Sequence, residues 1–184
     1  HGPGEHYLML MRLVGWKRPD IVVEACTRRN LPLVVAGAGR ALQGLRKIAG
    51  PTVRFVGQVN DEQMRDLYRN CKALILPSEE DFGITPLEAM ASGRPVIAYG
   101  RGGVLDTVRP GVTGVFFGKQ TADSVVEAIA VFEHSRFDGE IIRHHAEGFD
   151  SSVFRARLSE FIDGQMRARR GARQPQPVFA LAGD

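Results

Sequence analysis

Two carboxylates separated by seven residues are the first side chains that could do chemistry. Glu80 and Glu88 lie in a stretch where we expect a strand to end in a loop and a helix to follow. Gly83 between them lets the backbone approach a ligand closely. Thr85 can cap the helix, and Pro86 suits its first turn. Free backbone amides at such a helix start, together with the helix dipole, form a site for an anion such as phosphate.

Two cations five positions apart make a second candidate pair. Arg12 and Lys17 follow the first apolar run of the chain. The arginine offers a fork of donors and the lysine a compact point charge, so the pair could neutralise a diphosphate. Both pairs also have plainer explanations. The cations could be solvated surface residues, and Glu88 could only stabilise a helix whose first turn favours a carboxylate.

The elements that must position these residues follow a regular alternation of short apolar runs and amphipathic helices. This alternation predicts an α/β fold with a doubly wound, Rossmann-like parallel sheet and helices on both faces. Ligands of such folds collect at the carboxyl ends of the strands, where the loops over 12–18, 37–40, 56–59, 78–85 and 99–103 lie. We expect strands over 7–11, 32–36, 52–56, 73–76, 95–98 and 114–117, and helices over 18–29, 41–48, 86–92, 121–133 and 152–167.

A further helix is predicted between residues 60 and 71. Asn60 or Asp61 can cap it, and Met64, Leu67, Tyr68 and Cys71 repeat at helical spacing.

The two cysteines, Cys26 and Cys71, are too few for a disulfide framework. Each falls in a predicted helix beside core residues, so we expect buried free thiols, which suit a reducing compartment. The histidines are scattered, and the adjacent pair His144 and His145 would point in different directions on a helix. No metal site is therefore expected.

Composition and charge limit the kinds of protein and partner that remain possible. The chain of 184 residues has a net charge of +3, part of it in a basic run near the end. We expect one domain over 1–168 and a basic, proline-containing flexible tail over 169–184. The tail is either solvated or attracted to an anionic membrane surface. No aromatic residues are interleaved with it, which argues against nucleic acid. With no apolar span and no signal peptide recognised, we predict a cytoplasmic protein, with the inner membrane face as an alternative.

The stretch around the two carboxylates resembles the E-x7-E signature of family-4 retaining glycosyltransferases with the GT-B fold. The resemblance continues over residues 88–96 and covers 7–161 as a whole. It implies that Glu80 faces the donor sugar and that Glu88 accepts hydrogen bonds from the ribose hydroxyls. Backbone amides around Phe82, Gly83 and Ile84 would hold sugar hydroxyls and phosphate, beside the helix start at Thr85.

The same resemblance assigns roles to weaker signals. Arg12 and Lys17 match an R-x4-K pair that clamps the donor pyrophosphate and assists its departure, without a metal. The loop with Gly39 and Arg40 would lie near the phosphates. Residues 56–59, with Val56 and Gly57 as the candidate contacts, resemble the segment whose backbone meets the nucleobase, although they also suit an ordinary strand-end turn. These are the predicted donor contacts outside the E-x7-E stretch.

The loop that begins at Gly37 also resembles the start of a dinucleotide fingerprint. However, Leu42 stands where the third glycine belongs, and the preceding strand is not the first. A dehydrogenase is therefore disfavoured.

A more detailed resemblance in two segments implies the identity of the sugar donor. Residues 17–20 and 98–103 look most like mannosyltransferases of bacterial surface-polysaccharide assembly, which implies GDP-mannose as donor and a polysaccharide or lipid-linked acceptor. Arg18, where many relatives have glycine, and Asp106, where glutamate is more usual, depart from the pattern.

The resemblance accounts for one half of a GT-B enzyme, and nothing in this chain looks like the N-terminal acceptor domain. We therefore expect the isolated chain to be inactive. The alternatives are a module that binds a nucleotide sugar without activity of its own, and a related GT-B nucleotide-sugar epimerase or glycogen-type transferase.

Overall fold

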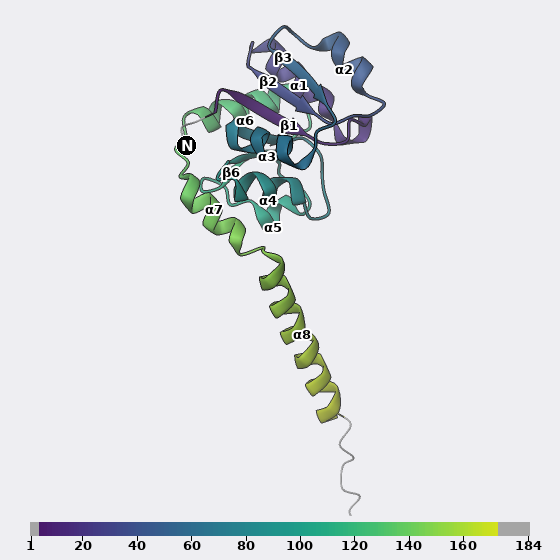
Figure 1. The fold of residues 1–184 in the computed structure, drawn as a ribbon, viewed down its shortest axis with the longest axis vertical. Coiled ribbons are helices and arrows are strands. Elements are labelled where there is room, and N and C mark those ends of the chain that lie inside the picture. Colours follow the sequence, from purple (N-terminus) through teal and green to yellow (C-terminus); the bar gives the residue numbers. More distant parts are fainter. Residues whose placement is uncertain (1–3, 173–184) are drawn as a thin grey trace, which may run out of the picture. The chain divides into compact units, whose positions relative to one another are not determined.

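A computed structural model describes residues 4–172 of the chain, which divide into two compact units. The first ends at Glu147 and holds the whole sheet (Figure 1). The second begins at Gly148 and contains one long helix, α8 (Ser151–Ala172). Of the tail predicted from residue 169, residues 169–172 continue α8, and the rest lies outside the described residues.

The first unit contains a six-stranded sheet in the order β3-β2-β1-β4-β5-β6, in which all neighbouring strands are parallel. The order reverses direction between β1 and β4, as in a doubly wound Rossmann-like fold. The predicted fold class is thus confirmed. The strands are β1 (His6–Leu10), β2 (Leu33–Ala36), β3 (Val53–Gly57), β4 (Cys71–Leu76), β5 (Val96–Tyr99) and β6 (Gly114–Phe117).

Helices connect these strands and form two groups. α1 contacts α2 and α6, whereas α4 contacts α3, α5 and α7. Right-handed crossovers on either side of the reversal place the two groups on opposite faces of the sheet. The helices are η1 (Gly15–Lys17), α1 (Pro19–Arg28), α2 (Leu42–Ile48), α3 (Asp61–Asn70), α4 (Ile84–Ala91), α5 (Val104–Thr107), α6 (Ala122–Glu133) and α7 (Gly139–Glu147).

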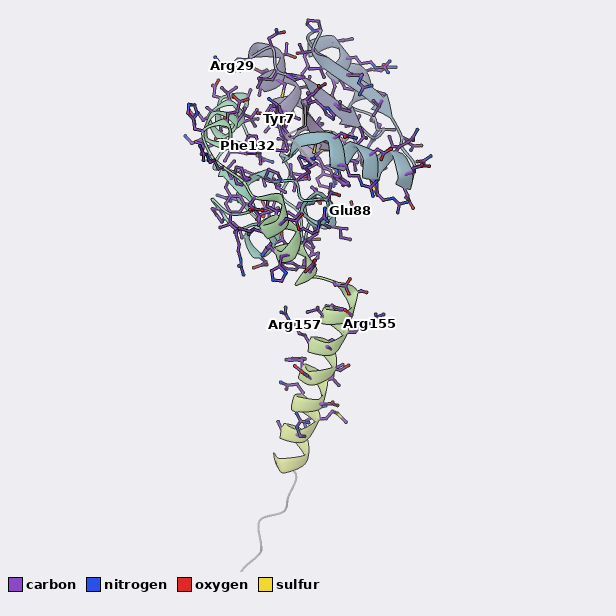
Figure 2. All side chains as sticks on the ribbon, turned by 60° about the vertical axis from the view of Figure 1, so that its left-hand side comes forward. Tyr7, Arg29, Glu88, Phe132, Arg155 and Arg157 are labelled. Atoms are coloured by element: carbon purple, nitrogen blue, oxygen red, sulfur yellow. The ribbon has the colours of Figure 1, made fainter. Side chains whose placement is uncertain are left out.

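The central strands are almost completely buried, and large side chains fill the space between sheet and helices. Tyr7 of β1 and Phe132 of α6 lie edge to face with ring centroids 6.0 Å apart (Figure 2). The Tyr7 hydroxyl donates to Glu133 Oε1 at 2.9 Å, which satisfies a polar group that would otherwise be buried without a partner.

Two predicted helix boundaries change in the structure. Gly83 adopts a left-handed conformation (φ 88°) and precedes α4, which therefore begins at Ile84. Thr85 is the second helical residue, so it does not cap the helix as predicted. Glu88 is the fifth, beyond the first turn. Cys71 begins β4 instead of ending α3, because the strand follows the helix without a loop. A buried position fits either element, so the apolar pattern did not separate the two.

Other local predictions are confirmed. Asn60 caps α3 in a capping box, in which its side chain accepts from the Gln63 amide and Gln63 accepts from the Asn60 amide. Cys26 and Cys71 are free and buried. Burial raises the pKa of each thiol to about 12 because it disfavours the thiolate.

The helix α8, described by itself, exposes its large apolar side chains. They are Phe154, Leu158, Phe161, Ile162 and Met166. Within residues 4–172, no helix is both long enough and apolar enough to span a bilayer.

Candidate functional site

A cavity of about 840 Å³ opens at the carboxyl ends of β1 and β4, where the strand order reverses. This is the position at which doubly wound sheets bind ligands. Its wall comes from the loops after β1, β2, β3 and β4 and from the first turns of α3 and α4. The predicted site residues in this wall are Arg12, Lys17, Glu80, Phe82, Gly83, Ile84 and Thr85.

An ion pair crosses the cavity wall between the loops after β1 and β4. Lys17 Nζ lies 2.7 Å from Glu80 Oε1, and both side chains are about four-fifths buried. Ser78, which is fully buried, donates to the same oxygen at 2.5 Å. Lys17 also lies over the ring of Trp16, 5.1 Å from its centroid. The carboxylate is thus held at one oxygen, and the lysine charge is balanced.

Arg12 is the second cation of the wall. Its side chain is exposed, and it forms no ion pair with any residue in the described range. An arginine in this state keeps its five N–H donors available to a ligand. The wall therefore offers two cations to a phosphate. The Arg12 guanidinium is available, and a phosphate could replace Glu80 as the partner of the Lys17 ammonium group.

The start of α4 faces the same cavity. No side chain caps this eight-residue helix after Gly83, and Gly83, Ile84 and Thr85 all line the cavity. Its first backbone amides therefore have no intrahelical or side-chain acceptor, which leaves them suited to bind an anion.

Two glycines outside the predicted site support the loop that carries Glu80. The Gly103 amide donates to the Glu80 carbonyl at 2.7 Å. A Cβ at Gly103 would lie 2.4 Å from the Asp81 carbonyl oxygen and from Phe82 Cα, so no other residue fits without a shift of the loop. A Cβ at Gly102 would likewise lie 2.5 Å from the Glu80 carbonyl oxygen. The paired glycines in the sequence were the signal that could have identified this support.

Glu88 is not in the cavity wall. It lies on α4 about one turn beyond Thr85 (Figure 2), and the Tyr68 hydroxyl donates to Glu88 Oε2 at 2.8 Å. Tyr68 is buried, with 1% of its surface exposed. Burial and, secondarily, the hydrogen bond to Glu88 raise the pKa of the Tyr68 phenol, which therefore stays protonated. The sequence indicated Tyr68 as a core residue and missed this contact.

The other predicted residues, Gly39, Arg40, Val56 and Gly57, also lie outside the wall. A Cβ at Gly39 would lie 2.0 Å from the Leu13 carbonyl oxygen, so this glycine packs against the loop after β1. The Gly57 carbonyl accepts from the Gly37 amide at 2.7 Å. Other residues of the predicted loops 37–40 and 56–59 line the cavity instead, namely Gly37, Ala38, Gln58 and Val59. Met64 of α3 also lines it and was not predicted.

Comparison with known proteins identifies relatives. A family model described as "Glycosyl transferases group 1" matches residues 3–147. A D-inositol 3-phosphate glycosyltransferase of Geodermatophilus obscurus is 32% identical over 96% of this chain and 45% of its own length. An alpha-1,3/1,6-mannosyltransferase of Dictyostelium discoideum is 54% identical over a shorter region, 34% of this chain and 15% of its own length.

A solved structure shares the fold. HepE of Anabaena, crystallised with UDP and glucose, matches with a TM-score of 0.69 and 20% identity over 88% of this chain and 48% of that one. The chain thus spans about half the length of the Geodermatophilus relative and of the HepE chain.

Proposed function

Because this chain belongs to the family of group 1 glycosyl transferases, we propose that its cavity binds the nucleotide-sugar donor of a retaining hexosyl transfer. The observation that carries the proposal is the convergence of Arg12, Lys17 and the start of α4 on one cavity that also presents Glu80. A diphosphate needs cationic and amide donors, and a sugar needs a fixed carboxylate as hydrogen-bond acceptor. This cavity offers both.

Each group has a role in the proposed reaction. The bond between the sugar C1 and the diphosphate oxygen breaks, and its electron pair stays with the departing nucleoside diphosphate. Arg12 and Lys17 stabilise the charge that develops there. Glu80 holds the sugar hydroxyls so that C1 faces the acceptor oxygen, and Glu88 serves the ribose. The acceptor oxygen bonds to C1 on the face that keeps the anomeric configuration, and its hydroxyl proton passes to the departing diphosphate.

We propose GDP-mannose as the donor and a polysaccharide or lipid-linked acceptor. Residues 17–20 and 98–103 resemble those of polysaccharide mannosyltransferases, and the Dictyostelium relative is named a mannosyltransferase. HepE was crystallised with UDP and glucose, so a UDP-hexose is the competing donor. The experiment below separates the two.

The isolated chain should bind the donor without transferring it. The chain spans 45% of the Geodermatophilus relative, and the acceptor would bind to the part that this chain does not include. A module that only binds nucleotide sugars predicts the same result for the chain alone. A chain joined to the part of the relative that it does not match would distinguish them, since only an enzyme transfers sugar to an acceptor. An epimerase would instead convert the donor alone, which incubation without acceptor detects.

The proposed compartment is the cytoplasm, because both thiols are free and cysteines stay reduced there. A proposed contact between the basic tail and an anionic membrane falls mostly on residues outside the described range.

Titration calorimetry tests the donor site directly. The chain is titrated with GDP, UDP and ADP, each with and without magnesium. We expect metal-independent binding of GDP above the others, and a loss of about tenfold or more for Arg12→Ala and for Lys17→Ala, because each removes a charge-assisted hydrogen bond. Lys47→Ala removes an exposed cation of α2 and should change nothing. Equal effects of all three variants, or no nucleotide binding, would contradict the site.

A further inference from the structure

We propose that Tyr68 is a positioning residue that holds Glu88 ready for the ribose of the bound nucleotide. Its hydroxyl binds Glu88 Oε2 and leaves Oε1 to accept from a ribose hydroxyl. This inference rests on the proposed function, in which Glu88 serves the ribose.

The position of the pair supports this role. α3 and α4 both begin at the cavity, and their first-turn residues Met64 and Thr85 line it. Tyr68 and Glu88 follow these residues by four and three positions, which places them roughly 5 Å further along each helix. The pair therefore lies directly behind the cavity wall, and Glu88 is only partly buried. A carboxylate placed there can reach a ligand that extends past Met64 and Thr85.

The hydrogen bond also leaves the carboxylate half satisfied. Oε2 accepts from Tyr68, whereas Oε1 accepts no hydrogen bond from any residue in the described range. A glutamate has three side-chain torsions, and ordering them on binding costs conformational entropy. Tyr68 fixes the carboxylate before the ligand arrives, which strengthens any hydrogen bond that Oε1 then accepts.

A purely structural role is the competing explanation, because the Tyr68 ring also belongs to the hydrophobic core. The same chain provides a matched case. Tyr7 is equally buried and donates to Glu133 Oε1 at 2.9 Å, but on the opposite side, against α6 and away from the cavity. Tyr7→Phe and Tyr68→Phe each remove one partly buried tyrosine–glutamate hydrogen bond and keep the ring, so both variants should fold with similar losses of stability.

The test measures preference for the ribose hydroxyls. Calorimetry gives the affinities for GDP and for 2′,3′-dideoxy-GDP, or for the UDP pair if UDP binds more tightly. For the unmodified chain we expect the hydroxyls to raise the affinity about tenfold or more. Tyr68→Phe should reduce this preference about three- to tenfold with little change for the dideoxy nucleotide, and Tyr7→Phe should leave it unchanged. Glu88→Ala should abolish it, and the double variant Tyr68→Phe/Glu88→Ala should lose no more.

Failure takes distinguishable forms. If Glu88→Ala keeps the preference, Glu88 does not serve the ribose, and both this inference and that part of the proposed function are overturned. If Glu88→Ala abolishes the preference while Tyr68→Phe retains it in full, the proposed function stands and the role of Tyr68 is overturned. An equal loss for both nucleotides in Tyr68→Phe would show that Tyr68 only supports the fold.

Discussion

At the scale of single residues, Glu80 shares one of its oxygens between a lysine and a buried serine. Lys17 and Ser78 both donate to Oε1, so the arrangement keeps the second oxygen available to a donor sugar. Glu80 also occupies the Lys17 ammonium group, which we propose binds the diphosphate. Binding of the donor must therefore replace at least part of the Lys17–Glu80 interaction.

This competition leads to a prediction for Glu80→Gln. Removal of the negative charge frees Lys17, so we expect GDP to bind about threefold more tightly, consistent with the modest worth of a partly exposed ion pair. The additional affinity that the sugar gives GDP-mannose over GDP should fall, because the amide is a weaker acceptor than the carboxylate. Calorimetry with both ligands measures the two effects. Glu79→Gln, in the same loop, should alter neither, and weaker GDP binding in Glu80→Gln would refute the competition.

At the scale of elements, the loop after β4 is shaped by a second loop, the one after β5. Gly102 pairs with Glu80 in an isolated bridge, and the Gly103 amide donates to the Glu80 carbonyl. Neither glycine lines the cavity, so their effect on a ligand passes through the backbone of Glu80, Asp81 and Phe82. A change that alters this backbone should affect binding without touching the ligand.

Gly103→Ala tests this contact. Its Cβ would lie 2.4 Å from two backbone atoms, which cannot rotate away as a side chain would. We expect the free energy of unfolding to fall by about 1–3 kcal/mol. The affinity for GDP-mannose should fall about tenfold or more, which is the effect of losing one hydrogen bond to a charged group. Urea unfolding and calorimetry measure both.

The control is Gly44→Ala in α2, where the added methyl meets nothing within 4 Å. It should be neutral or stabilising by about 0.5–1 kcal/mol. Unchanged donor affinity in Gly103→Ala would show that the loop adapts without consequence for the site.

At the scale of the whole molecule, the compact unit that contains the sheet ends with α7. Ile142 is fully buried, Ala146 nearly so, and His145 Nε2 lies 2.7 Å from the Thr107 carbonyl oxygen. α8 belongs to the second compact unit, and the first unit is compact without it. The two final helices should therefore differ in what they contribute to the stability of this unit.

Truncation measures that difference. A chain that ends after Glu147 should keep its melting temperature within a few degrees and its affinity for GDP. A chain that ends after Asp138 loses the burial of Ile142, which alone is worth about 1.5–3 kcal/mol, and should melt far lower or fail to fold. If the two truncations are equally damaging, α8 contributes to the fold of the first unit.

Stability should also depend on pH through the buried thiols. The folded pKa of Cys26 and Cys71 is raised to about 12 from an ordinary value of 9.0, so the native state keeps protons that the unfolded chain releases. Stability is therefore fully present below pH 9 and falls between about pH 9 and pH 12. The slope is about 1.4 kcal/mol per pH unit for each thiol.

Urea unfolding at pH 8, 9 and 10 measures this loss. The Cys26→Ala/Cys71→Ala chain is the comparison and should lose less stability over the same interval. Identical pH dependence of the two chains would exclude the thiols as its source.

The sequence by itself determined the elements and the edge of the sheet at which to look. The apolar runs and amphipathic repeats predict the strands, and parallel strands bring the loops that follow them to one edge. Arg12, Lys17 and Glu80 could therefore be expected to lie together, and in the structure they do. Short or weakly patterned elements were missed. α5 has four residues, too few to show a period, and α7 has only two buried ones, Ile142 and Ala146.

Tertiary structure alone decided which side chains meet. Tyr68 looked like one more apolar position of α3, and only the packing of α3 against α4 directs its hydroxyl to Glu88. Gly103 lies against the backbone of Asp81 because the loops after β4 and β5 follow neighbouring strands. Periodicity records which face of an element is buried. It does not record the distance or direction between side chains on different elements, which depends on how those elements pack.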